Sequence, residues 1–598
     1  MSPYAARLKK TVVAPSVQPH APARWPANET IALIFDDIAE LLEVQGANPF
    51  RIRAYHNAAR TLRGLTYELA KLIAQGKQPE KLRGIGKDLL GKIQEITTTG
   101  DCALHQRLRE SMPGLVQLLA IPGLGPKRVQ HLYQELGIQT LEQLSEAASQ
   151  GRIRHLRGFG AETENRLLKA AQGSVGERRL PLAWVAPLAQ RLCEYLQDFP
   201  GVRTAAVAGS LRRMRDTIGD IDLLVTAPPD IAVMAHFLRY PAIKTQLQQG
   251  PTRASVILDD GLQVDLRVVD PAVEGAALLY FTGSKAHNIA LRQRAKKHNL
   301  KLSEYGLFSG IQCLARASET QVYLALGLPW IAPELREDRG EILAALNGQL
   351  PCLIESGDIK GDLHAHTPLD GGPRALEDMA LAARAAGLEY LAITDDSAFL
   401  QGERGPEFER LEQQIEQIDA INRRLSGITL LKGLEVEILE DGRLDVPDSL
   451  LAHLDLVVGA VRKHFTLPSA QQTRRLLRAM EHQYFTLLAH PLCRLINERG
   501  PLAMDFPAVV KAAARRGCCL ELNAQPQRMD LFDLQCQYAR DHGVLISISA
   551  DARIGADFGY LPYGVGQARR AWLEKSQVLN TRSLVQLGDY LRRVRGDA

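Results

Sequence analysis

The order of hydrophobic and polar positions divides the chain into three regions. Through about residue 175 the apolar residues recur at helical spacing, beginning with Ile31, Ile34, Phe35 and Ile38. From about residue 180 to 335 strand-like and helical stretches are mixed, and beyond residue 357 apolar strand-like runs alternate with amphipathic helices. This pattern predicts a multidomain protein with a helical N-terminal part, an α+β middle and a C-terminal βα barrel.

The apolar runs of the last region end beside polar side chains. Such runs occupy residues 391–393, 456–458, 486–488 and 545–548. Glu435, His490 and Asp551 lie at the ends of runs of this kind, and all three residue types bind metals. Because the carboxyl ends of the strands form the site of a βα barrel, we expect these side chains to meet there.

Length and composition limit the class of protein. With 598 residues the chain should hold several domains, and the absence of any run of 18 or more apolar residues argues against a membrane span. The N-terminus lacks the long apolar core of a secretory signal, and eight cysteines without a Cys-x-x-Cys pair indicate reduced thiols in a cytoplasm.

The net charge of +4 does not by itself indicate a polyanion partner, but its distribution does. Residues 51–92 carry a cluster of basic side chains that is opposed by few acidic ones. The basic residues are Arg51, Arg53, Arg60, Arg63, Lys71, Lys77, Lys81, Arg83, Lys87 and Lys92. We expect this segment to face the phosphate backbone of a nucleic acid.

Three short segments of the helical region resemble one another, and each precedes an expected helix. They are Leu82-Arg83-Gly84-Ile85-Gly86, Ile121-Pro122-Gly123-Leu124-Gly125 and Leu156-Arg157-Gly158-Phe159-Gly160. This is the helix-hairpin-helix pattern, in which a tight Gly-x-Gly turn exposes N–H groups at a helix start to phosphate. Such contacts carry no base information, so we expect binding that does not depend on sequence.

The middle region carries a Gly-Ser turn followed by closely spaced aspartates. The motif reads Gly209-Ser210-Leu211-Arg212-Arg213 and then Gly219-Asp220-Ile221-Asp222, with an apolar strand after it. Side chains alternate along a strand, so Asp220 and Asp222 point to one face, and Asp265 lies in a second, alternating strand. The turn and Arg213 offer N–H groups, a hydroxyl and a guanidinium to phosphate. Three carboxylates beside such a cradle predict two-metal phosphoryl or nucleotidyl transfer.

Together these motifs resemble the bacterial family X DNA polymerases, the polymerase beta-like enzymes with an additional PHP (polymerase and histidinol phosphatase) domain. The resemblance covers nearly everything after residue 28 and is most specific at 209–222 and at Tyr280-Phe281-Thr282-Gly283-Ser284. It implies that Asp220, Asp222 and Asp265 hold two Mg²⁺ (or Mn²⁺) ions. It also implies that the incoming nucleotide contacts Gly209, Ser210, Arg213, Gly219, Tyr280, Phe281, Gly283, Asn288 and Arg292.

The N-terminal segment resembles the small lyase domain of the same family. Lys92 falls where that domain has its Schiff-base lysine, and Arg51 and Tyr55 match positions that contact a 5′-phosphate. We expect the surrounding cations to depress the pKa of Lys92, so that a neutral amine can attack a sugar aldehyde. The alternative is that Lys92 binds phosphate or is a solvated helix lysine.

The resemblance is incomplete in the PHP region, whose relatives hold a trinuclear metal site. His364, His366, Glu435, His490 and Asp551 match the ligand pattern. Other ligand positions hold different residues, namely Gly371 for an aspartate and Asp396, Arg462 and Arg553 for histidines.

Arginine has no lone pair for a metal and carries its own positive charge. We therefore expect Arg462 and Arg553 to replace metal charge by pairing with Glu435, Asp551 or Asp396, which makes a metal at this site doubtful. A single metal at His364, His366 and Glu435 stays open as an alternative. The expected outcome is a barrel whose 3′–5′ exonuclease is weakened or lost.

The sequence thus predicts a flexible tail (1–28), a lyase-like helical domain (29–100), helix-hairpin-helix fingers (101–178), a nucleotidyltransferase palm with thumb (179–335), a linker (336–356) and a PHP barrel (357–598). We expect a monomeric, cytoplasmic DNA polymerase that fills short gaps during DNA repair, including base excision repair. Its partners would be deoxynucleoside triphosphates and gapped or nicked DNA with a 5′-phosphate. The alternatives are a metal-dependent 3′–5′ exonuclease or phosphoesterase acting through the barrel, and a non-catalytic binder of DNA ends.

Overall fold

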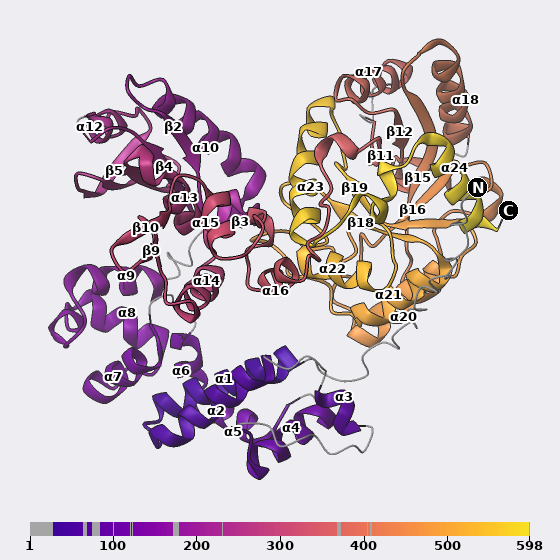
Figure 1. The fold of residues 1–598 in the computed structure, drawn as a ribbon. Coiled ribbons are helices and arrows are strands. Elements are labelled where there is room, and N and C mark those ends of the chain that lie inside the picture. The colour runs from indigo at the N-terminus through magenta and orange to yellow at the C-terminus, as the bar shows by residue number, and fades with distance from the viewer. Residues whose placement is uncertain are drawn as a thin grey trace, which may run out of the picture. The chain divides into compact units, whose positions relative to one another are not determined.

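The structure is a computed structural model, and its elements are shown in Figure 1. It describes residues 28–63, 69–74, 84–99, 101–119, 121, 124–171, 179–229, 231–367, 372–402, 405–406 and 409–596. The expected tail up to residue 27 lies outside this range, as do Gly123 and Gly371. The chain divides into two compact units, Met1–Arg178 and Arg179–Ala598.

The described elements of the N-terminal unit are helical, as predicted. Its helices are α1 (Asn28–Val44), α2 (Pro49–Arg63), α3 (Leu69–Ala74), α4 (Lys87–Thr99), α5 (Ala103–Ser111), α6 (Pro113–Leu119), α7 (Pro126–Leu136), α8 (Leu141–Ser149) and α9 (Ala161–Ala171). The helices α4, α7 and α9 begin directly after Gly86, Gly125 and Gly160, so each hairpin motif does precede a helix. Pro126 at the first turn and the left-handed Gly137 at the end fix the limits of α7.

A five-stranded sheet, here called the central sheet, forms the middle of the chain. Its strand order is β2 (Thr204–Val207), β4 (Asp220–Thr226), β7 (Gln263–Val269), β6 (Arg253–Leu258) and β5 (Ile243–Gln249). The strands β4 and β7 are parallel, whereas the other neighbours are antiparallel. Its helices are α10 (Leu182–Gln197), α11 (Gly209–Arg212) and α12 (Val233–Phe237), and a short pair is formed by β1 (Leu180–Pro181) and β3 (Thr217–Ile218).

Residues 274–346 follow the central sheet with helices and a small antiparallel sheet. These elements are α13 (Glu274–Thr282), α14 (Lys285–Lys297), β8 (Lys301–Ser303), β9 (Gly306–Ser309), β10 (Gln312–Ala315), α15 (Glu319–Ala325) and α16 (Glu341–Leu346). Residues 336–356, expected as a linker, are packed instead, since they include α16 and the fully buried Arg336 and Glu341. Glu341 bonds His287 at 2.5 Å, and this partner inside the domain explains why the segment folds against it.

The last region is a nearly closed parallel barrel, as the alternation of strands and helices predicts. Its strands follow chain order: β11 (Gly361–Ala365), β12 (Tyr390–Ile393), β15 (Thr429–Glu437), β16 (Leu456–Ala460), β17 (Phe485–Leu488), β18 (Cys519–Asn523) and β19 (Ile546–Ser549). A parallel bridge between Ala365 and Ala552 brings the first strand back to the end of the last.

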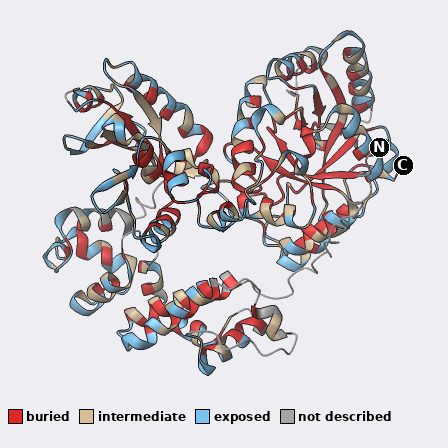
Figure 2. Ribbon diagram, in the orientation of Figure 1, coloured by how far each residue is buried: buried red, intermediate tan, exposed pale blue. Residues whose placement is uncertain are grey.

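Helices surround these strands, which are buried almost throughout (Figure 2). They are α17 (Gly372–Ala385), α18 (Glu409–Arg424), α19 (Asp448–Leu451), α20 (Ser469–Met480), α21 (Phe506–Arg516), α22 (Asp533–Asp541), α23 (Leu561–Arg570) and α24 (Leu584–Arg595). Burial on both faces explains why the barrel strands read as continuous apolar runs rather than alternating ones.

Among the described residues, no helix combines the length and the apolar character that crossing a membrane requires.

Candidate active site

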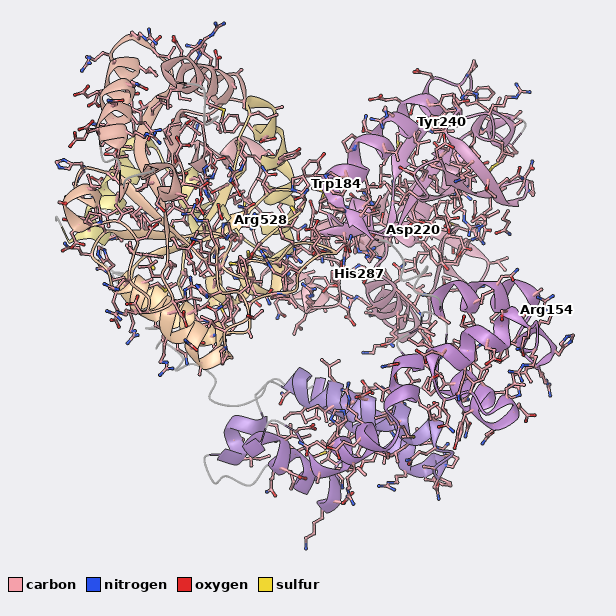
Figure 3. All side chains as sticks on the ribbon, turned by 180° about the vertical axis from the view of Figure 1, so that it is seen from behind. Arg154, Trp184, Asp220, Tyr240, His287 and Arg528 are labelled. Carbon is pink, nitrogen blue, oxygen red and sulfur yellow. The ribbon has the colours of Figure 1, made fainter. Side chains whose placement is uncertain are left out.

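Three carboxylates meet on one face of the central sheet. Asp222 on β4 lies directly opposite Asp265 on the parallel strand β7, and Asp220 precedes Asp222 by two residues on the same face (Figure 3 labels Asp220). One oxygen from each of the three lies within 4.8 Å of the others. Asp265 accepts hydrogen bonds from Ser255 Oγ and, at 3.0 Å, from Gln263 Nε2, which fix its orientation.

This cluster fits divalent cations. Burial, together with the charges of Asp220 and Asp265, raises the pKa of Asp222 to about 7. Bound cations would remove this repulsion and keep all three groups ionised, and oxygen-only donors are the ligands that Mg²⁺ and Mn²⁺ accept.

Gly209 is required for the approach of Asp222. It has a φ of +58°, and a Cβ at this position would overlap the Asp222 Oδ2 oxygen. The backbone N–H of Ala208 also donates to the Asp222 carbonyl at 2.8 Å. The Gly-Ser turn therefore packs directly against the strand that carries Asp222, and a side chain at position 209 would prevent this contact.

A pocket of about 710 Å³ opens beside the aspartates. Residues expected to hold a nucleotide line it: Gly209, Ser210, Arg213, Tyr280, Phe281, Gly283, Asn288 and Arg292. Gly219, also expected there, lies between β3 and β4 next to Asp220 and is not one of the lining residues. Ser210 Oγ is buried and has no hydrogen-bond partner among the described residues, so a ligand oxygen would satisfy it.

Tyr280 and Phe281 form the aromatic side of this pocket, and two arginine side chains and an asparagine amide hold them in place. Asn288 on α14 donates to the Tyr280 carbonyl at 2.7 Å. The guanidinium of Arg292 lies over the Tyr280 ring at 5.8 Å, and that of Arg267 lies over Phe281 at 5.2 Å. The contacts of Asn288 and Arg292 hold the start of α14 against the end of α13, and the contact of Arg267 holds Phe281 against β7.

Sequence reasoning missed the acidic residues that hold Arg212 and Arg213, the two arginines that follow the Gly-Ser turn. Arg213 donates to Glu337 at 3.1 Å and to the Thr282 carbonyl at 2.6 Å. Glu319 binds Arg212 and Arg336 through both of its oxygens; burial alone would raise the pKa of Glu319, but these two arginines lower it to about 2. Both carboxylates lie more than 100 residues after the turn, and no local spacing signals the pairing.

A second cluster lies at the carboxyl ends of the barrel strands. His364 Nε2, His366 Nε2 and Asp551 Oδ1 are buried and form no hydrogen bond of good geometry with any described residue, although His366 Nε2 lies 3.2 Å from Asp551 Oδ1. These three residues can bring one ligand atom each within 4.8 Å of the others. Glu435 Oε2 lies 3.6 Å from both imidazole Nε2 atoms, and His490 Nε2 lies 3.6 Å from Glu435 Oε1. Buried polar atoms aimed at one point fit one divalent cation.

Arg462 occupies the neighbouring position. Its guanidinium is bonded to Asp396, lies 3.3 Å from Glu437 and lies 3.9 Å from Glu435. The pairing expected from the sequence with Asp396 and Glu435 is thus present, whereas Arg553 is largely exposed and approaches Asp551 only to 4.0 Å. A cation beside Asp396 does not fit while Arg462 holds this place, because both are positive.

Comparison with known proteins decides the family. The family descriptions "DNA polymerase beta thumb", "Helix-hairpin-helix domain" and "SAM-like Helix-hairpin-helix tandem" match residues 277–337, 26–102 and 115–172. A protein of Bacillus subtilis strain 168 named DNA polymerase/3′-5′ exonuclease PolX is 36% identical over 570 residues, which cover 94% of this chain and 99% of the relative.

The chain belongs to the bacterial family X DNA polymerases. DNA polymerase lambda of Rattus norvegicus is also similar, at 26% identity over 50% of this chain and 54% of its own length. A protein of Syntrophotalea carbinolica named probable phosphatase is 29% identical over 38% of this chain and 95% of its own length. Similarity to such phosphatases fits a PHP domain, in agreement with the nearly closed barrel.

For Lys92, expected from the sequence as a Schiff-base lysine, the predicted depression of the pKa is wrong. Lys92 donates to Asp88 at 2.6 Å, one helical turn earlier. Burial acts to lower the pKa of Lys92, yet Asp88 and Tyr55 outweigh it and the pKa is raised. Asp88 stands four residues before Lys92, so the i,i+4 spacing could have revealed this ion pair. Tyr55, expected at a phosphate, is only 1% exposed and packs edge-on against Phe35 at 5.5 Å.

The raised pKa has a measurable consequence. A raised pKa leaves less neutral Lys92 amine at pH 7 than an ordinary lysine has, so borohydride trapping of an aldehyde on DNA is expected to be weak and to rise with pH. Asp88→Asn removes the pairing charge and should increase trapping several-fold at pH 7. Asp36→Asn, which affects a pair with His56 in the same unit, serves as the control. Equal trapping by wild type and Asp88→Asn would contradict this account.

The hairpin glycines are positioned for close approach by a ligand. Gly84, Gly86, Gly125, Gly158 and Gly160 are exposed, and Arg51 is exposed as well. A Cβ on any of the last four glycines would meet no described atom within 4 Å, and one on Gly84 would meet Asn57 only at 4.0 Å. The open space before these turns is compatible with a phosphate backbone.

Sequence reasoning also overlooked Glu521 on β18. It is fully buried, accepts from His364 Nδ1 at 2.7 Å and accepts from the His490 backbone N–H at 2.6 Å. A carboxylate that fixes the far nitrogen of an imidazole orients the near nitrogen toward a metal. The signal was a lone glutamate inside the apolar run Cys518-Cys519-Leu520-Glu521-Leu522.

Proposed function

We propose that this family X polymerase fills short gaps in DNA by template-directed nucleotidyl transfer at Asp220, Asp222 and Asp265. The observation that carries this proposal is the meeting of the three carboxylates beside a pocket lined by Ser210 and Arg213. Two Mg²⁺ ions bound there would lower the pKa of a primer hydroxyl and neutralise the charge of a triphosphate.

The side chains divide the remaining tasks. Ser210 Oγ, the N–H groups of the Gly209 turn and Arg213 would grip the β- and γ-phosphates of the incoming nucleotide. Tyr280 and Phe281 would line the sugar, and Arg292 would reach the template minor groove, as the family resemblance implies. The hairpin glycines and the basic helices would hold the DNA without reading its sequence.

The proposed substrates are deoxynucleoside triphosphates and gapped or nicked DNA with a 5′-phosphate, and we place the enzyme in the cytoplasm as a monomer. Primer extension on a duplex with a one-nucleotide gap tests this assignment. Incorporation of the complementary nucleotide in the presence of Mg²⁺ or Mn²⁺ is expected, with faster filling when the downstream strand carries a 5′-phosphate. Tight DNA binding without any incorporation would overturn it and favour a non-catalytic binder of DNA ends.

We propose further that the 3′–5′ exonuclease of the barrel is weakened. The supporting observation is the ion pair of Arg462 with Asp396, which places a positive charge where His366, Asp396 and Glu435 could otherwise hold a second cation. Little Mn²⁺-dependent degradation of a primer strand is expected from the wild type. Strong degradation that His364→Ala abolishes would contradict this and would favour the phosphoesterase alternative.

A further inference from the structure

The turn that carries Arg213 is held from the barrel as well as from its own domain. This turn, Arg213–Asp216, connects α11 with β3 and so links the phosphate-binding residues to the strand of Asp220 and Asp222. Met214 within it has a φ of +54°. A non-glycine residue in the left-handed region needs surrounding contacts to keep it there.

Arg570, at the end of the barrel helix α23, supplies the main contacts. Its side chain is only 2% exposed. Arg570 Nη1 donates to the Arg213 carbonyl at 2.8 Å and to Glu337 at 2.9 Å, and Nη2 donates to Asp533 at 2.7 Å. Glu337 Oε1 accepts from both Arg570 and Arg213, so one carboxylate oxygen joins the two guanidinium groups.

Two neighbouring barrel residues complete the anchor. Gln567, one turn earlier on α23, donates to the Met214 carbonyl at 2.5 Å. A Cβ at Gly566 would overlap the Met214 side chain, so α23 lies directly against the turn. Arg494 donates to the Asp216 carboxylate at 2.9 Å. Met529 of the barrel is fully buried within the hydrophobic core of the central sheet. The contact between the barrel and the central region therefore includes buried apolar packing as well as these polar bonds.

We propose that Arg570, assisted by Gln567, is a positioning residue for nucleotide binding: the barrel holds Arg213 in the orientation that grips the triphosphate. This inference rests on the proposed polymerase function. The chemistry is specific to arginine, because the donors of a guanidinium are spread over three nitrogens and can reach a backbone carbonyl and two carboxylates at once. The three donors of a lysine ammonium all extend from one nitrogen and cannot span these acceptors. The barrel thereby contributes to synthesis without touching the substrate.

The test is a comparison of single-nucleotide gap filling by Arg570→Lys and wild type in the full chain. The KM for the nucleotide is expected to rise about tenfold, with kcat and DNA affinity within about twofold, since loss of ground-state and transition-state binding together raises KM alone. Arg540→Lys is the matched control. Arg540 also donates to backbone carbonyls next to α23, those of Ala571 and Trp572, but within the described part of the chain its side chain forms no hydrogen bond or ion pair with the central region.

A double-mutant cycle separates positioning from general destabilisation. If Arg570 acts through Arg213, Arg570→Lys should raise KM no further in an Arg213→Ala background. Equal effects in both backgrounds, or no change of KM in the single variant, would overturn the inference. If Arg570→Lys lowers the melting temperature too far for kinetics, Gln567→Met removes only the bond to Met214 and should raise KM about threefold; an unchanged KM there overturns the inference equally. The proposed polymerase function is tested separately: if the wild type fills the gap and Asp222→Asn does not, that function stands whatever the result for Arg570.

Discussion

Substituting Asp222 by asparagine is expected to reduce gap filling at least a thousand-fold, which corresponds to about 4 kcal/mol of transition-state stabilisation. Asp222 lies between Asp220 and Asp265, so an amide here removes one charge from the centre of the cluster. The exchange keeps the shape of the side chain, and the hairpin glycines lie in the other compact unit. DNA affinity is therefore expected to stay within about twofold of wild type.

Quenched time courses of nucleotide incorporation measure the rate of gap filling, and filter binding on the same gapped duplex measures DNA affinity. Asp198→Asn is a suitable control, because Asp198 is an exposed carboxylate at the end of α10 in the same region of the chain. Loss of DNA binding together with synthesis would indicate a wrong division of tasks between the two units. If Asp222→Asn still fills the gap at the wild-type rate, the three aspartates do not bind the catalytic metal ions as proposed.

The carboxylate cluster of the central region could be predicted because its geometry depends on local rules. The two-residue spacing of Asp220 and Asp222 places them on one face of a strand wherever that strand lies. An alternating strand around Asp265 provides the third group, and the parallel pairing of β4 with β7 brings it opposite Asp222. The barrel could be predicted for the same reason, since repeated strand and helix patterns leave few alternative topologies.

The anchoring network could not be predicted, because its members lie far apart in the chain. Arg213, Glu337 and Arg570 meet only after the barrel has packed against the central region. Charged residues are common, and nothing in the sequence distinguishes Glu337 from an exposed glutamate. The pairing of Lys92 is different, since Asp88 lies only one helical turn away and its direct ion pair outweighs the more distant cations.

Replacing Arg462 by histidine is the second change with a large expected effect. The guanidinium now bonds Asp396 and approaches Glu435. His366, Asp396 and Glu435 can bring one ligand atom each within 4.8 Å of one another, so removing the positive charge and adding an imidazole should create a second cation position. Mn²⁺ content measured by elemental analysis should rise from about one to about two ions per chain in an Asp220→Ala/Asp222→Asn background, which removes the other cluster's contribution.

The matched variant is Arg462→Leu, which removes the charge without adding a ligand and separates electrostatic relief from coordination. Arg478→His adds an imidazole on α20, where Arg478 is 56% exposed and pairs with Asp441, and should leave the metal content unchanged. Mn²⁺-dependent primer degradation should rise more than tenfold in Arg462→His and fall again when His364→Ala is added. Unchanged metal content in Arg462→His would mean that Arg462 is not what limits the barrel to one cation. The cause would then lie with the other departures from the ligand pattern, Gly371, Asp396 and Arg553.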